Sequence, residues 1–356
     1  MIPVSIVNVT SYTGLELLRL LAAHPAFVVT SVTGRGTAGQ RLDTVFPQFA
    51  PGRNHPMTSP GFQRLLITEQ AEKTDFAFVC LPHAAAAETV VALLAQDTKV
   101  IDLSADFRLR DVAVYESWYQ HTHPAPDLLE SAVYGLCERY REHIASARLI
   151  ANPGCHATAS ILALIPAVAA GIIGPDIVAQ TLTGISGAGR GLKLSSLYCE
   201  QDEDASAYSL DGHRHLAEMT QELEAAARDG GHPLQEALRI TFVPHVIPMS
   251  RGLLATCSAD LKDTSLTIDE LRDLYAGYYA NEPYVRILET PPHTKWTTGT
   301  NLCLIYPTID QRTGRLLVVS CLDNLGKGAA GQAIQNANIL AGQPETAGLP
   351  AVSLYP

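Results

Sequence analysis

Residues 4–14 read VSIVNVTSYTG. The β-branched run Val4–Val7 predicts a strand, and the turn after it leads into leucines at helical spacing between Leu15 and Leu21. A second β-rich run, Phe27–Val32, completes a strand–turn–helix–strand unit. Such a unit predicts a parallel sheet with a helix packed against it.

The same alternation continues along the first part of the chain. Phe76–Leu81 is expected to be a buried strand, Ala84–Leu94 a helix and Val100–Leu103 another strand. Because alternating strands and helices build a parallel sheet covered on both faces, this region predicts a doubly wound α/β fold. Residues 51–60, rich in proline and glycine, are expected to form a loop.

The pattern changes near Asn152. Beyond it we expect an α+β arrangement, with a helix over 157–170 and strands near 178–182, 240–243, 302–306 and 316–321. One more helix is expected over Gly326–Leu340. Because 356 residues are many for a single core, the length also predicts two domains.

Composition narrows the functional classes. Apolar residues make up 47% and charged residues 17%, which indicates a folded globular protein. The formal net charge of −11 repels phosphate backbones and anionic lipids, so nucleic acid and membrane surfaces are not expected partners. The seven cysteines include no CxxC pair, which favours a reducing compartment, the cytoplasm. We expect neither a signal peptide nor a membrane-spanning segment.

The turn Asn8–Gly14 is a candidate phosphate-binding turn. A dinucleotide fold aims backbone N–H groups and a helix N-terminus at the pyrophosphate. Only Gly14 matches the glycine pattern of such turns, but asparagine tolerates left-handed backbone, so Asn8 is expected to replace the first glycine. The motif alone leaves an ordinary strand–helix turn as the alternative.

The second predicted strand ends in Thr33-Gly34-Arg35-Gly36. An acidic residue at this point would hold a ribose hydroxyl of NAD, whereas an arginine suits the 2′-phosphate of NADP. The position of Arg35 therefore favours NADP, with a surface arginine in a glycine loop as the alternative.

Cys155 is the candidate nucleophile. It lies in NPGCHAT, residues 152–158, where a Pro-Gly turn leads into an apolar helix. Unpaired N–H groups and the helix dipole favour a thiolate at such a position. The other six cysteines lie mostly in apolar, strand-like runs, which favours buried and unreactive thiols.

The densest ionisable cluster is DGHRHLAE, residues 211–218. His215 and Glu218 are i, i+3 neighbours on a predicted helix, so the carboxylate can orient the imidazole. His213 is expected in the preceding turn. No further thiol or carboxylate has a regular ligand spacing, so catalysis is favoured over metal binding. A solvated helix start is the other alternative.

Further motifs follow in one order along nearly the whole chain: VIDLSADFRL (100–109), AVYGLCE (132–138), SGAGR (186–190), PHVIPMSRG (244–252), TKWTTGTN (294–301) and DNLGKGAAGQAIQNAN (323–338). With the motifs above, they resemble the N-acetyl-gamma-glutamyl-phosphate reductases, arginine-biosynthesis enzymes related to aspartate-semialdehyde dehydrogenase. The resemblance implies a Rossmann-type NADP-binding domain of residues 1–153 and 327–356. It also implies a catalytic and oligomerisation domain of residues 154–326, α+β with a mixed or antiparallel sheet.

The resemblance also implies roles for individual residues. The catalytic set is Cys155, His213, His215 and Glu218. The NADP contacts are Thr10, Ser11, Tyr12, Thr13, Gly34, Arg35, Gly36 and Asn324. The candidate substrate-binding residues are Arg108, Asn152 and Arg190, with Asn152 part of an oxyanion site. In the family the turn has glycines at the places of Asn8 and Ser11, and a Cβ at Ser11 hinders close approach of the backbone to the pyrophosphate.

The implied reaction reduces N-acetyl-L-glutamyl 5-phosphate to the 5-semialdehyde with NADPH, through a thioester on Cys155. The expected partners are a small-molecule substrate and further copies of the chain, as a dimer or tetramer, and no metal is expected. Three alternatives are open. They are a lysine-pathway homologue acting on carrier-bound aminoadipyl phosphate, a cofactor-free cysteine acyltransferase or hydrolase, and a non-catalytic NADP-binding protein. The intact cysteine and histidine cluster disfavours the last.

Overall fold

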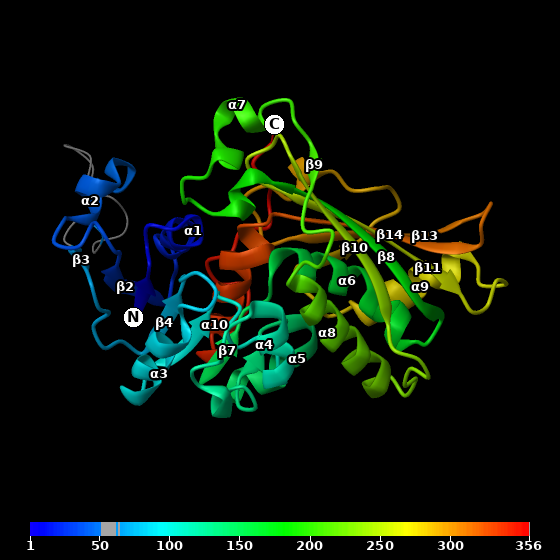
Figure 1. Ribbon diagram of the computed structural model, residues 1–356, viewed down its shortest axis with the longest axis horizontal. Coiled ribbons are helices and arrows are strands. Elements are labelled where there is room, and N and C mark those ends of the chain that lie inside the picture. Colours follow the sequence, from blue (N-terminus) through cyan, green and yellow to red (C-terminus); the bar gives the residue numbers. More distant parts are fainter. Residues whose placement is uncertain (51–61, 63–64, 356) are drawn as a thin grey trace. The chain divides into compact units, whose positions relative to one another are not determined.

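The computed structural model describes residues 1–50, 62 and 65–355, so the loop expected at 51–60 lies outside the described residues. The chain forms two compact units (Figure 1). The first comprises residues 1–153 and 329–349, and the second residues 154–328 and 350–356. Within the described part of the chain, no helix is both long enough and apolar enough to cross a bilayer.

The first unit contains a seven-stranded sheet in which every neighbouring pair is parallel. Its strands are β1 (Ile2–Val7), β2 (Phe27–Thr33), β3 (Ile67–Thr68), β4 (Phe76–Val79), β5 (Lys99–Asp102), β6 (Val133–Tyr134) and β7 (Leu149–Ala151). Their order is β3-β2-β1-β4-β5-β7-β6, which reverses direction between β1 and β4. The predicted doubly wound α/β fold is confirmed, and its ligand crevice is expected at the carboxyl ends of β1 and β4.

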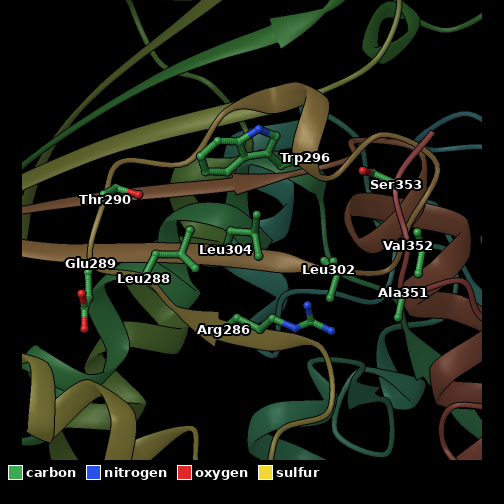
Figure 2. Close-up of a pocket in the computed structure, with 10 residues that line it drawn as sticks. All are labelled: Arg286, Leu288, Glu289, Thr290, Trp296, Leu302, Leu304, Ala351, Val352 and Ser353. Atoms are coloured by element: carbon green, nitrogen blue, oxygen red, sulfur yellow. The ribbon is translucent and has the colours of Figure 1, made fainter. Parts of the chain in front are cut away.

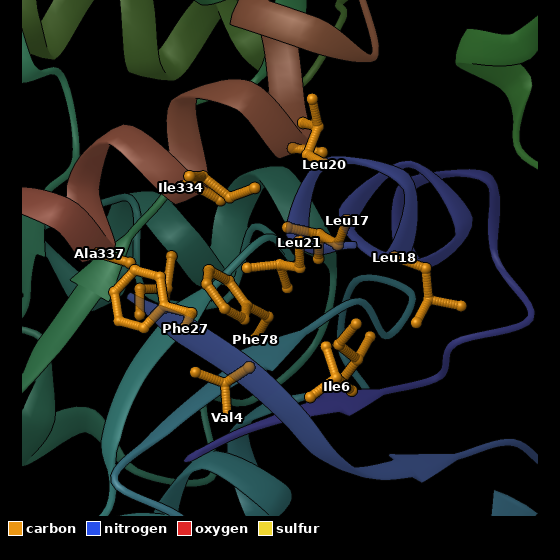
Figure 3. Close-up of a cluster of buried hydrophobic side chains, with 14 of the residues drawn as sticks. Val4, Ile6, Leu17, Leu18, Leu20, Leu21, Phe27, Phe78, Ile334 and Ala337 are labelled. Atoms are coloured by element: carbon orange, nitrogen blue, oxygen red, sulfur yellow. The ribbon is translucent and has the colours of Figure 1, made fainter. Parts of the chain in front are cut away.

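Helices cover both faces of this sheet. One hydrophobic cluster joins the strands to α1 (Tyr12–Leu21), α5 (Cys137–Ser146) and α10 (Gly331–Leu340), and a second joins them to α3 (Ala87–Ala95). Figure 3 shows the first cluster, in which Phe27 and Phe78 of the sheet lie near Leu21 of α1 and Ile334 of α10. Because both faces are buried, β4 is apolar at every position and does not alternate. The first unit also holds the short α2 (Leu42–Val45) and α4 (Val112–Tyr119).

Two helices differ from the sequence-based expectation. The helix expected from Ala84 begins at Ala87, because Ala84 is left-handed (φ 60°) and the Asp106 carboxylate accepts the N–H groups of Ala84, Ala86 and Ala87. A carboxylate twenty residues away in the chain thus caps α3, which no local pattern indicates. The helix expected from Gly326 starts with a π-helical turn, Gly326–Ala330, before α10.

The second unit contains a mixed seven-stranded sheet in the order β12-β13-β14-β11-β8-β10-β9. Its strands are β8 (Ile173–Gly184), β9 (Ser206–Ala207), β10 (Arg239–Ile247), β11 (Leu253–Leu261), β12 (Val285–Ile287), β13 (Cys303–Asp310) and β14 (Arg315–Leu322). The pairs β8–β10 and β12–β13 are parallel and the others antiparallel, which confirms the predicted mixed sheet.

The strands of this sheet have two unlike faces. In β8 the side chains of Ile177, Ala179 and Thr181 are buried, whereas Val178 and Leu182, at alternate positions, are half-buried. The elements packed with this sheet are α6 (Cys155–Ala169), α8 (His215–Asp229) and α9 (Ile268–Tyr278). Because strand side chains alternate, one face belongs to the core and the other is partly open. The short α7 (Tyr198–Gln201) is exposed.

The central helix of the second unit is α6, which is buried from His156 to Val168. Pro166 lies inside it and supplies no N–H to the Leu162 carbonyl four residues earlier. The hydroxyl of Tyr279, just after α9, donates to that carbonyl at 2.6 Å. Tyr275 of α9 donates in the same way to the Ala163 carbonyl at 2.7 Å. The two tyrosines therefore satisfy backbone groups beside the proline.

The units differ from the expected domain boundaries at the C-terminal side. Residues 327–328 and 350–356, expected with the first domain, group with the second unit. The chain end is held there because the Pro350 carbonyl accepts the Asn301 N–H at 3.0 Å and the Leu354 N–H donates to Thr298 at 3.0 Å. The side chain of Leu354 also packs on Gly299.

Candidate active site

Cys155 is the first residue of α6. Gly154 before it is the N-cap, with extended backbone (φ −74°, ψ 148°), so the sulfur stands at the helix N-terminus as predicted. Cys155 is partly exposed, whereas five of the other six cysteines are buried and Cys199 is exposed. Burial raises the pKa of Cys80, Cys257 and Cys321 to about 12. Cys155 is the partly exposed thiol at the N-terminus of the fifteen-residue α6, whose dipole favours the thiolate, whereas Cys137 at the start of α5 is buried.

Glu218 connects the histidine cluster to the start of α6. The helix α8 begins at His215, and the His215 Nε2 lies 3.9 Å from Glu218 Oε1, which confirms the predicted i, i+3 pair. The other carboxylate oxygen, Oε2, accepts the Gly154 N–H at 3.1 Å. Glu218 is fully buried. One carboxylate thus lies against both the imidazole and the residue that precedes Cys155.

Two glycines bring neighbouring groups close to Cys155. A Cβ at Gly154 would overlap the His215 imidazole, so the ring lies directly against the N-cap of α6. A Cβ at Gly328 would lie 2.8 Å from the Cβ of Cys155. The sequence indicated neither contact, because both depend on the packing of distant segments.

His213 lies in the turn before α8, as expected. Its Nδ1 accepts the backbone N–H of His215 at 3.2 Å, so in the neutral ring the proton is on Nε2. Burial, with a smaller contribution from Arg214, lowers the pKa of His213 to about 4. Its ring packs on Phe242 and on His215, with centroid distances of 5.4 and 4.7 Å. His213 is therefore neutral near pH 7.

Three residues that sequence reasoning missed complete this cluster. His156 follows Cys155 and is buried, with Nδ1 2.8 Å from Thr181 Oγ1 and Nε2 2.9 Å from the Tyr208 hydroxyl. Burial, and to a lesser extent His213, lowers the pKa of His156 to about 3. The only sequence signal was the adjacency of His156 to Cys155. Thr181 lies in a strand and Tyr208 in a loop, and no pattern in the sequence indicated either residue.

The three imidazoles are also close enough to share an ion. The nitrogens of His156, His213 and His215 lie within 4.8 Å of one another. Both nitrogens of His156, however, are already hydrogen-bonded to Thr181 and Tyr208. A metal at this place would have to break one of those buried bonds, so the arrangement suits hydrogen bonding better than ligation.

The turn after β1 has the features of a dinucleotide turn. Asn8 is left-handed (φ 65°), which confirms the prediction that it replaces the first glycine. A Cβ at Gly14 would lie 2.7 Å from the Asn8 carbonyl, so α1 approaches β1 closely at this glycine. The Asn8 amide donates to the Cys80 carbonyl at 2.8 Å, across the point where the strand order reverses. These residues fit a pyrophosphate at the N-terminus of α1.

Ser11 is accommodated in this turn as the N-cap of α1. Its backbone is extended (φ −73°, ψ 160°), so it needs no glycine. Its hydroxyl accepts the Gly14 N–H and donates to the Asn8 carbonyl, both at 3.0 Å. The Thr13 hydroxyl lies 3.1 Å from it, and the Thr10 hydroxyl donates to the Asn8 side chain. Tyr12 is exposed.

The Gly34–Gly36 loop lies beside this turn. The Val9 N–H donates to the Thr33 carbonyl at 2.8 Å, which holds the ends of β1 and β2 together. A Cβ at Gly34 would lie 3.1 Å from Thr10 Cγ2. Arg35 is exposed, and Gly36 is left-handed (φ 77°). The two predicted NADP-contacting loops are therefore neighbours, with an arginine available for a 2′-phosphate.

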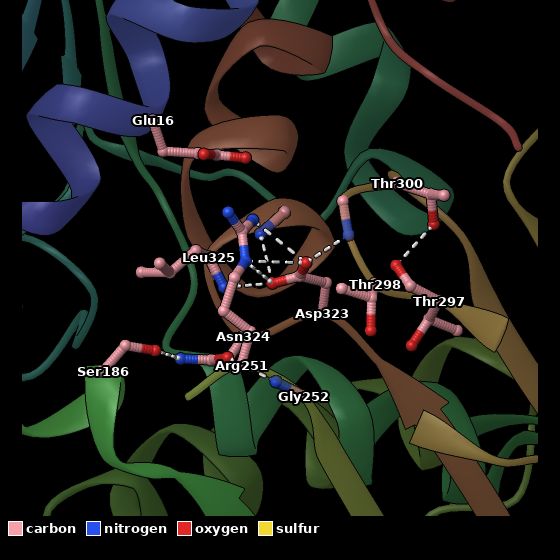
Figure 4. A network of polar contacts seen from close by, with 12 residues as sticks. Glu16, Ser186, Arg251, Gly252, Thr297, Thr298, Thr300, Asp323, Asn324 and Leu325 are labelled. Carbon is pink, nitrogen blue, oxygen red and sulfur yellow. Dashed lines mark hydrogen bonds and ion pairs between the residues drawn. The ribbon is translucent and has the colours of Figure 1, made fainter. Parts of the chain in front are cut away.

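Asn324 belongs to a buried polar network of the second unit (Figure 4). Its amide oxygen accepts the Gly252 N–H at 2.8 Å, and its amide nitrogen donates to Ser186 Oγ at 2.9 Å. The neighbouring Asp323 is fully buried and accepts from Arg251 and from the Gly299 N–H. The side chain of Asn324 is thus engaged within the protein. The network fixes the segment that brings Gly328 against Cys155.

The three predicted substrate-binding residues are in unlike surroundings. Arg108 is buried and donates to the carbonyls of Asn152 and Leu103. Asn152 is buried too, with its amide nitrogen bonded to the Ala329 carbonyl and its amide oxygen to Asn336. Arg190 is exposed in the loop after β8. Arg190 is thus at an exposed position, whereas Arg108 and Asn152 are buried and hold backbone and side-chain groups in place.

A cavity of about 450 Å³ lies elsewhere in the second unit (Figure 2). Leu288, Leu302 and Leu304 line it together with Trp296, and the chain-end residues Ala351, Val352 and Ser353 close one side. Its other lining residues are Arg286, Glu289 and Thr290. None of the residues around Cys155 takes part in it.

Comparisons with known families agree with this geometry. Residues 3–147 match the semialdehyde dehydrogenase NAD binding domain, and residues 155–324 match the semialdehyde dehydrogenase dimerisation domain. Among solved structures, aspartate semialdehyde dehydrogenase II of Vibrio cholerae complexed with ASA superposes with a TM-score of 0.67 at 15% identity, over 96% of this chain and 98% of that one. The aspartate semialdehyde dehydrogenase of Candida albicans with NADP gives 0.64 at 15% identity, over 96% and 99%. At this identity the likeness concerns the fold.

Sequence relatives are much closer. The N-acetyl-gamma-glutamyl-phosphate reductase of Dehalococcoides mccartyi strain CBDB1 is 48% identical over 352 residues, which cover 99% of this chain and 98% of that protein. The protein of the same name from Pelobacter propionicus is 45% identical over the full length of both chains. Two semialdehyde dehydrogenase domains and relatives of this identity leave one assignment: the chain belongs to the N-acetyl-gamma-glutamyl-phosphate reductase family.

Proposed function

We propose that this chain reduces N-acetyl-L-glutamyl 5-phosphate to N-acetyl-L-glutamate 5-semialdehyde and phosphate, with NADPH, in arginine biosynthesis. One observation carries the proposal: Cys155 begins α6 next to Gly154, which contacts both His215 and Glu218, in a chain 48% identical to a reductase of that name. Seven cysteines without a disulfide favour the cytoplasm as its place of action.

The reaction begins with acyl transfer to Cys155. The thiolate attacks the carbonyl carbon of the acyl phosphate, so an S–C bond forms and the bond from carbon to the phosphate oxygen breaks. Phosphate leaves with the electron pair, and a thioester remains. The α6 N-terminus favours the thiolate before attack, and its backbone N–H groups are the proposed donors for the developing oxyanion.

The first unit is proposed to hold NADPH. The residues that would hold it are those of the turn Thr10–Thr13, with Arg35 between Gly34 and Gly36 for the 2′-phosphate. When bound, NADPH supplies the hydride that reduces the thioester. Asn324 would act indirectly in this arrangement, by fixing Ser186 and Gly252 through its amide.

His215 is the proposed proton donor to the thiohemiacetal oxygen. Its Nε2 lies 3.9 Å from the Glu218 carboxylate, within ion-pair distance, and its ring lies against Gly154. His213 is neutral near pH 7, since burial lowers its pKa to about 4, and its Nδ1 holds the His215 backbone. His213 is therefore assigned to orient His215, and Glu218 to hold both His215 and the N-cap of α6.

Arg190 is the proposed anchor for an anionic group of the substrate, because an arginine pairs well with carboxylate or phosphate and this one lies at an exposed position after β8. Arg108 and Asn152 are proposed to support the site indirectly. Arg108 donates to the carbonyl of Asn152, three residues before Cys155, and so fixes the strand end from which α6 starts.

The chain is also proposed to form a homo-oligomer, dimer or tetramer, through the second unit. The matched domain is described as a dimerisation domain. In support, one face of the mixed sheet carries half-buried side chains such as Val178, Leu182 and Val319. A face of this kind gains stability when a second copy covers it.

One assay run in reverse tests the proposed function. N-acetyl-L-glutamate 5-semialdehyde, phosphate and NADP are mixed with the protein, and NADPH absorbance is followed. We expect a phosphate-dependent signal that Cys155→Ser abolishes. A signal with the aminoadipate analogue alone would move the protein to lysine synthesis. No signal with either substrate would favour the cofactor-free acyltransferase, and near-normal activity of Cys155→Ser would exclude the thioester route.

A further inference from the structure

A chain of three buried or half-buried polar groups lies behind the Cys155 site. The Thr181 hydroxyl of β8 is 2.8 Å from His156 Nδ1, and His156 Nε2 is 2.9 Å from the Tyr208 hydroxyl. Thr181 and His156 are almost completely buried, and Tyr208 is half-buried. None of the three has a role in the reaction as proposed above.

The direction of these hydrogen bonds follows from counting donors and acceptors. Burial lowers the pKa of His156 to about 3, so the ring is neutral and has one N–H. Among the described residues, the Thr181 hydroxyl has no partner other than His156 Nδ1. If Nδ1 carried the proton, the buried Thr181 proton would have no acceptor, which is unfavourable for a buried hydroxyl. Thr181 therefore donates to Nδ1.

The His156 proton must then be on Nε2, where it is donated to the Tyr208 oxygen. Because the Tyr208 oxygen accepts this bond, the phenol keeps its own proton for another acceptor. The described part of the chain offers it none, since the one partner of the Tyr208 hydroxyl is His156. The Tyr208 hydroxyl is thus a hydrogen-bond donor held in one orientation and available to a ligand, as an oxyanion-binding group must be.

The position of Tyr208 is suited to such a role. The centroid of its ring is 5.6 Å from that of the His213 ring, and the centroids of the His156 and His215 rings are 5.5 Å apart. Burial, together with the nearby Cys155, raises the pKa of the Tyr208 phenol above its ordinary value. Tyr208 therefore remains protonated at neutral pH and acts as a hydrogen-bond donor, without giving up its proton.

We propose that the Tyr208 hydroxyl donates a hydrogen bond to the substrate carbonyl oxygen when Cys155 adds to the acyl phosphate, and that His156 is the residue that positions it. In this step the S–C bond forms and the carbonyl electron pair moves to oxygen. The pair returns as the bond to phosphate breaks. No proton is transferred from Tyr208. The proposal rests on the proposed thioester function and adds a residue to it.

The test measures acylation without the cofactor. Enzyme is mixed with fresh N-acetyl-L-glutamyl 5-phosphate and no NADPH, and the first equivalent of phosphate released per site is timed. Tyr208→Phe, which removes only the phenolic oxygen, is expected to slow this release about 100-fold, as for loss of one oxyanion donor. The KM for the acyl phosphate should stay within about twofold, because the bond strengthens only as charge develops.

The matched control is Tyr198→Phe, the same change at a side chain 77% exposed, for which no slowing is expected. Circular dichroism and the rate of Cys155 alkylation by iodoacetamide check that Tyr208→Phe is folded with its nucleophile in place. A variant that passes both checks and releases phosphate within about threefold of wild type overturns the proposal.

His156 is tested by a double-mutant cycle. If His156 acts through Tyr208, His156→Phe slows phosphate release, and the pair His156→Phe/Tyr208→Phe is no slower than Tyr208→Phe alone. His156→Gln, which retains an N–H toward Tyr208, should recover part of the rate. Additive effects would show that His156 acts by another route, contrary to the proposal.

These outcomes are separable from failure of the proposed function. If wild type releases no phosphate, or if Cys155→Ser releases it normally, the thioester function itself is wrong. If wild type gives the phosphate and Cys155→Ser does not, the function stands, and the Tyr208→Phe result decides the present proposal alone.

Discussion

Gly154 sets how closely His215 can approach the start of α6. The imidazole occupies the space that a Cβ at this position would take, and the Gly154 N–H is bonded to Glu218. The backbone angles at Gly154 are ordinary, so any residue could adopt them. Glycine is needed here for space alone.

Gly154→Ala is therefore expected to displace His215 and lower kcat by about 100-fold, a loss that a displacement of about 1 Å can cause. Gly277→Ala in α9 is the control, because a Cβ at Gly277 meets nothing and its backbone is not left-handed. Steady-state kinetics of both variants provide the measurement. Unchanged kcat in Gly154→Ala would contradict the assigned contact.

The helix α6 carries the nucleophile and is held by contacts that compensate for a proline. Pro166 leaves the Leu162 carbonyl without its helical partner, and the Tyr279 hydroxyl replaces it. Because the carbonyl is in the core of the second unit, water cannot take the place of the hydroxyl. The stability of α6 thus depends on a residue more than one hundred positions away.

Tyr279→Phe tests this compensation. Loss of the hydroxyl leaves a buried carbonyl unsatisfied, and we expect the protein to lose about 1–3 kcal/mol of stability. In a thermal unfolding scan the midpoint should fall by several degrees. Tyr355→Phe, at an exposed side chain, should leave it unchanged. Because the α6 N-terminus is unaltered, the alkylation rate of Cys155 at low temperature should also be unchanged.

The two faces of the mixed sheet have different proposed roles, one in holding the Cys155 cluster and the other in assembly. Thr181 of β8 is on the buried face, where it holds His156, whereas Gln180 and Leu182 on either side of it face the other way. On that second face, Val319 pairs in register with Thr256, which pairs with Gln180. A change on this face can therefore alter assembly without touching the Cys155 cluster.

Val319→Arg places a charge in the middle of that face and is expected to reduce the assembled mass at least twofold. Light scattering after size-exclusion chromatography measures it. Val91→Arg, on a side chain 42% exposed in α3, should assemble like wild type. An unchanged mass for Val319→Arg would mean that another surface joins the subunits.

Much of this molecule follows from local sequence. The strands and helices predicted from hydrophobic periodicity are present in the structure, the left-handed Asn8 agrees with its residue type, and the His215–Glu218 pair agrees with helical spacing. These features depend on residues a few positions apart, whose geometry is fixed once the local backbone is fixed. The start of α3 was misplaced because its cap, Asp106, comes from a distant segment.

By itself, the sequence determined the two folds, the place of Cys155 at a helix start and the family. Only the tertiary structure decided that Glu218 holds Gly154, that Arg108 holds the Asn152 carbonyl, and that Thr181, His156 and Tyr208 form one chain. The partners in these bonds are 64, 44, 25 and 52 residues apart. Strand pairing and helix packing bring these residues together, and their spacing along the chain does not predict such contacts.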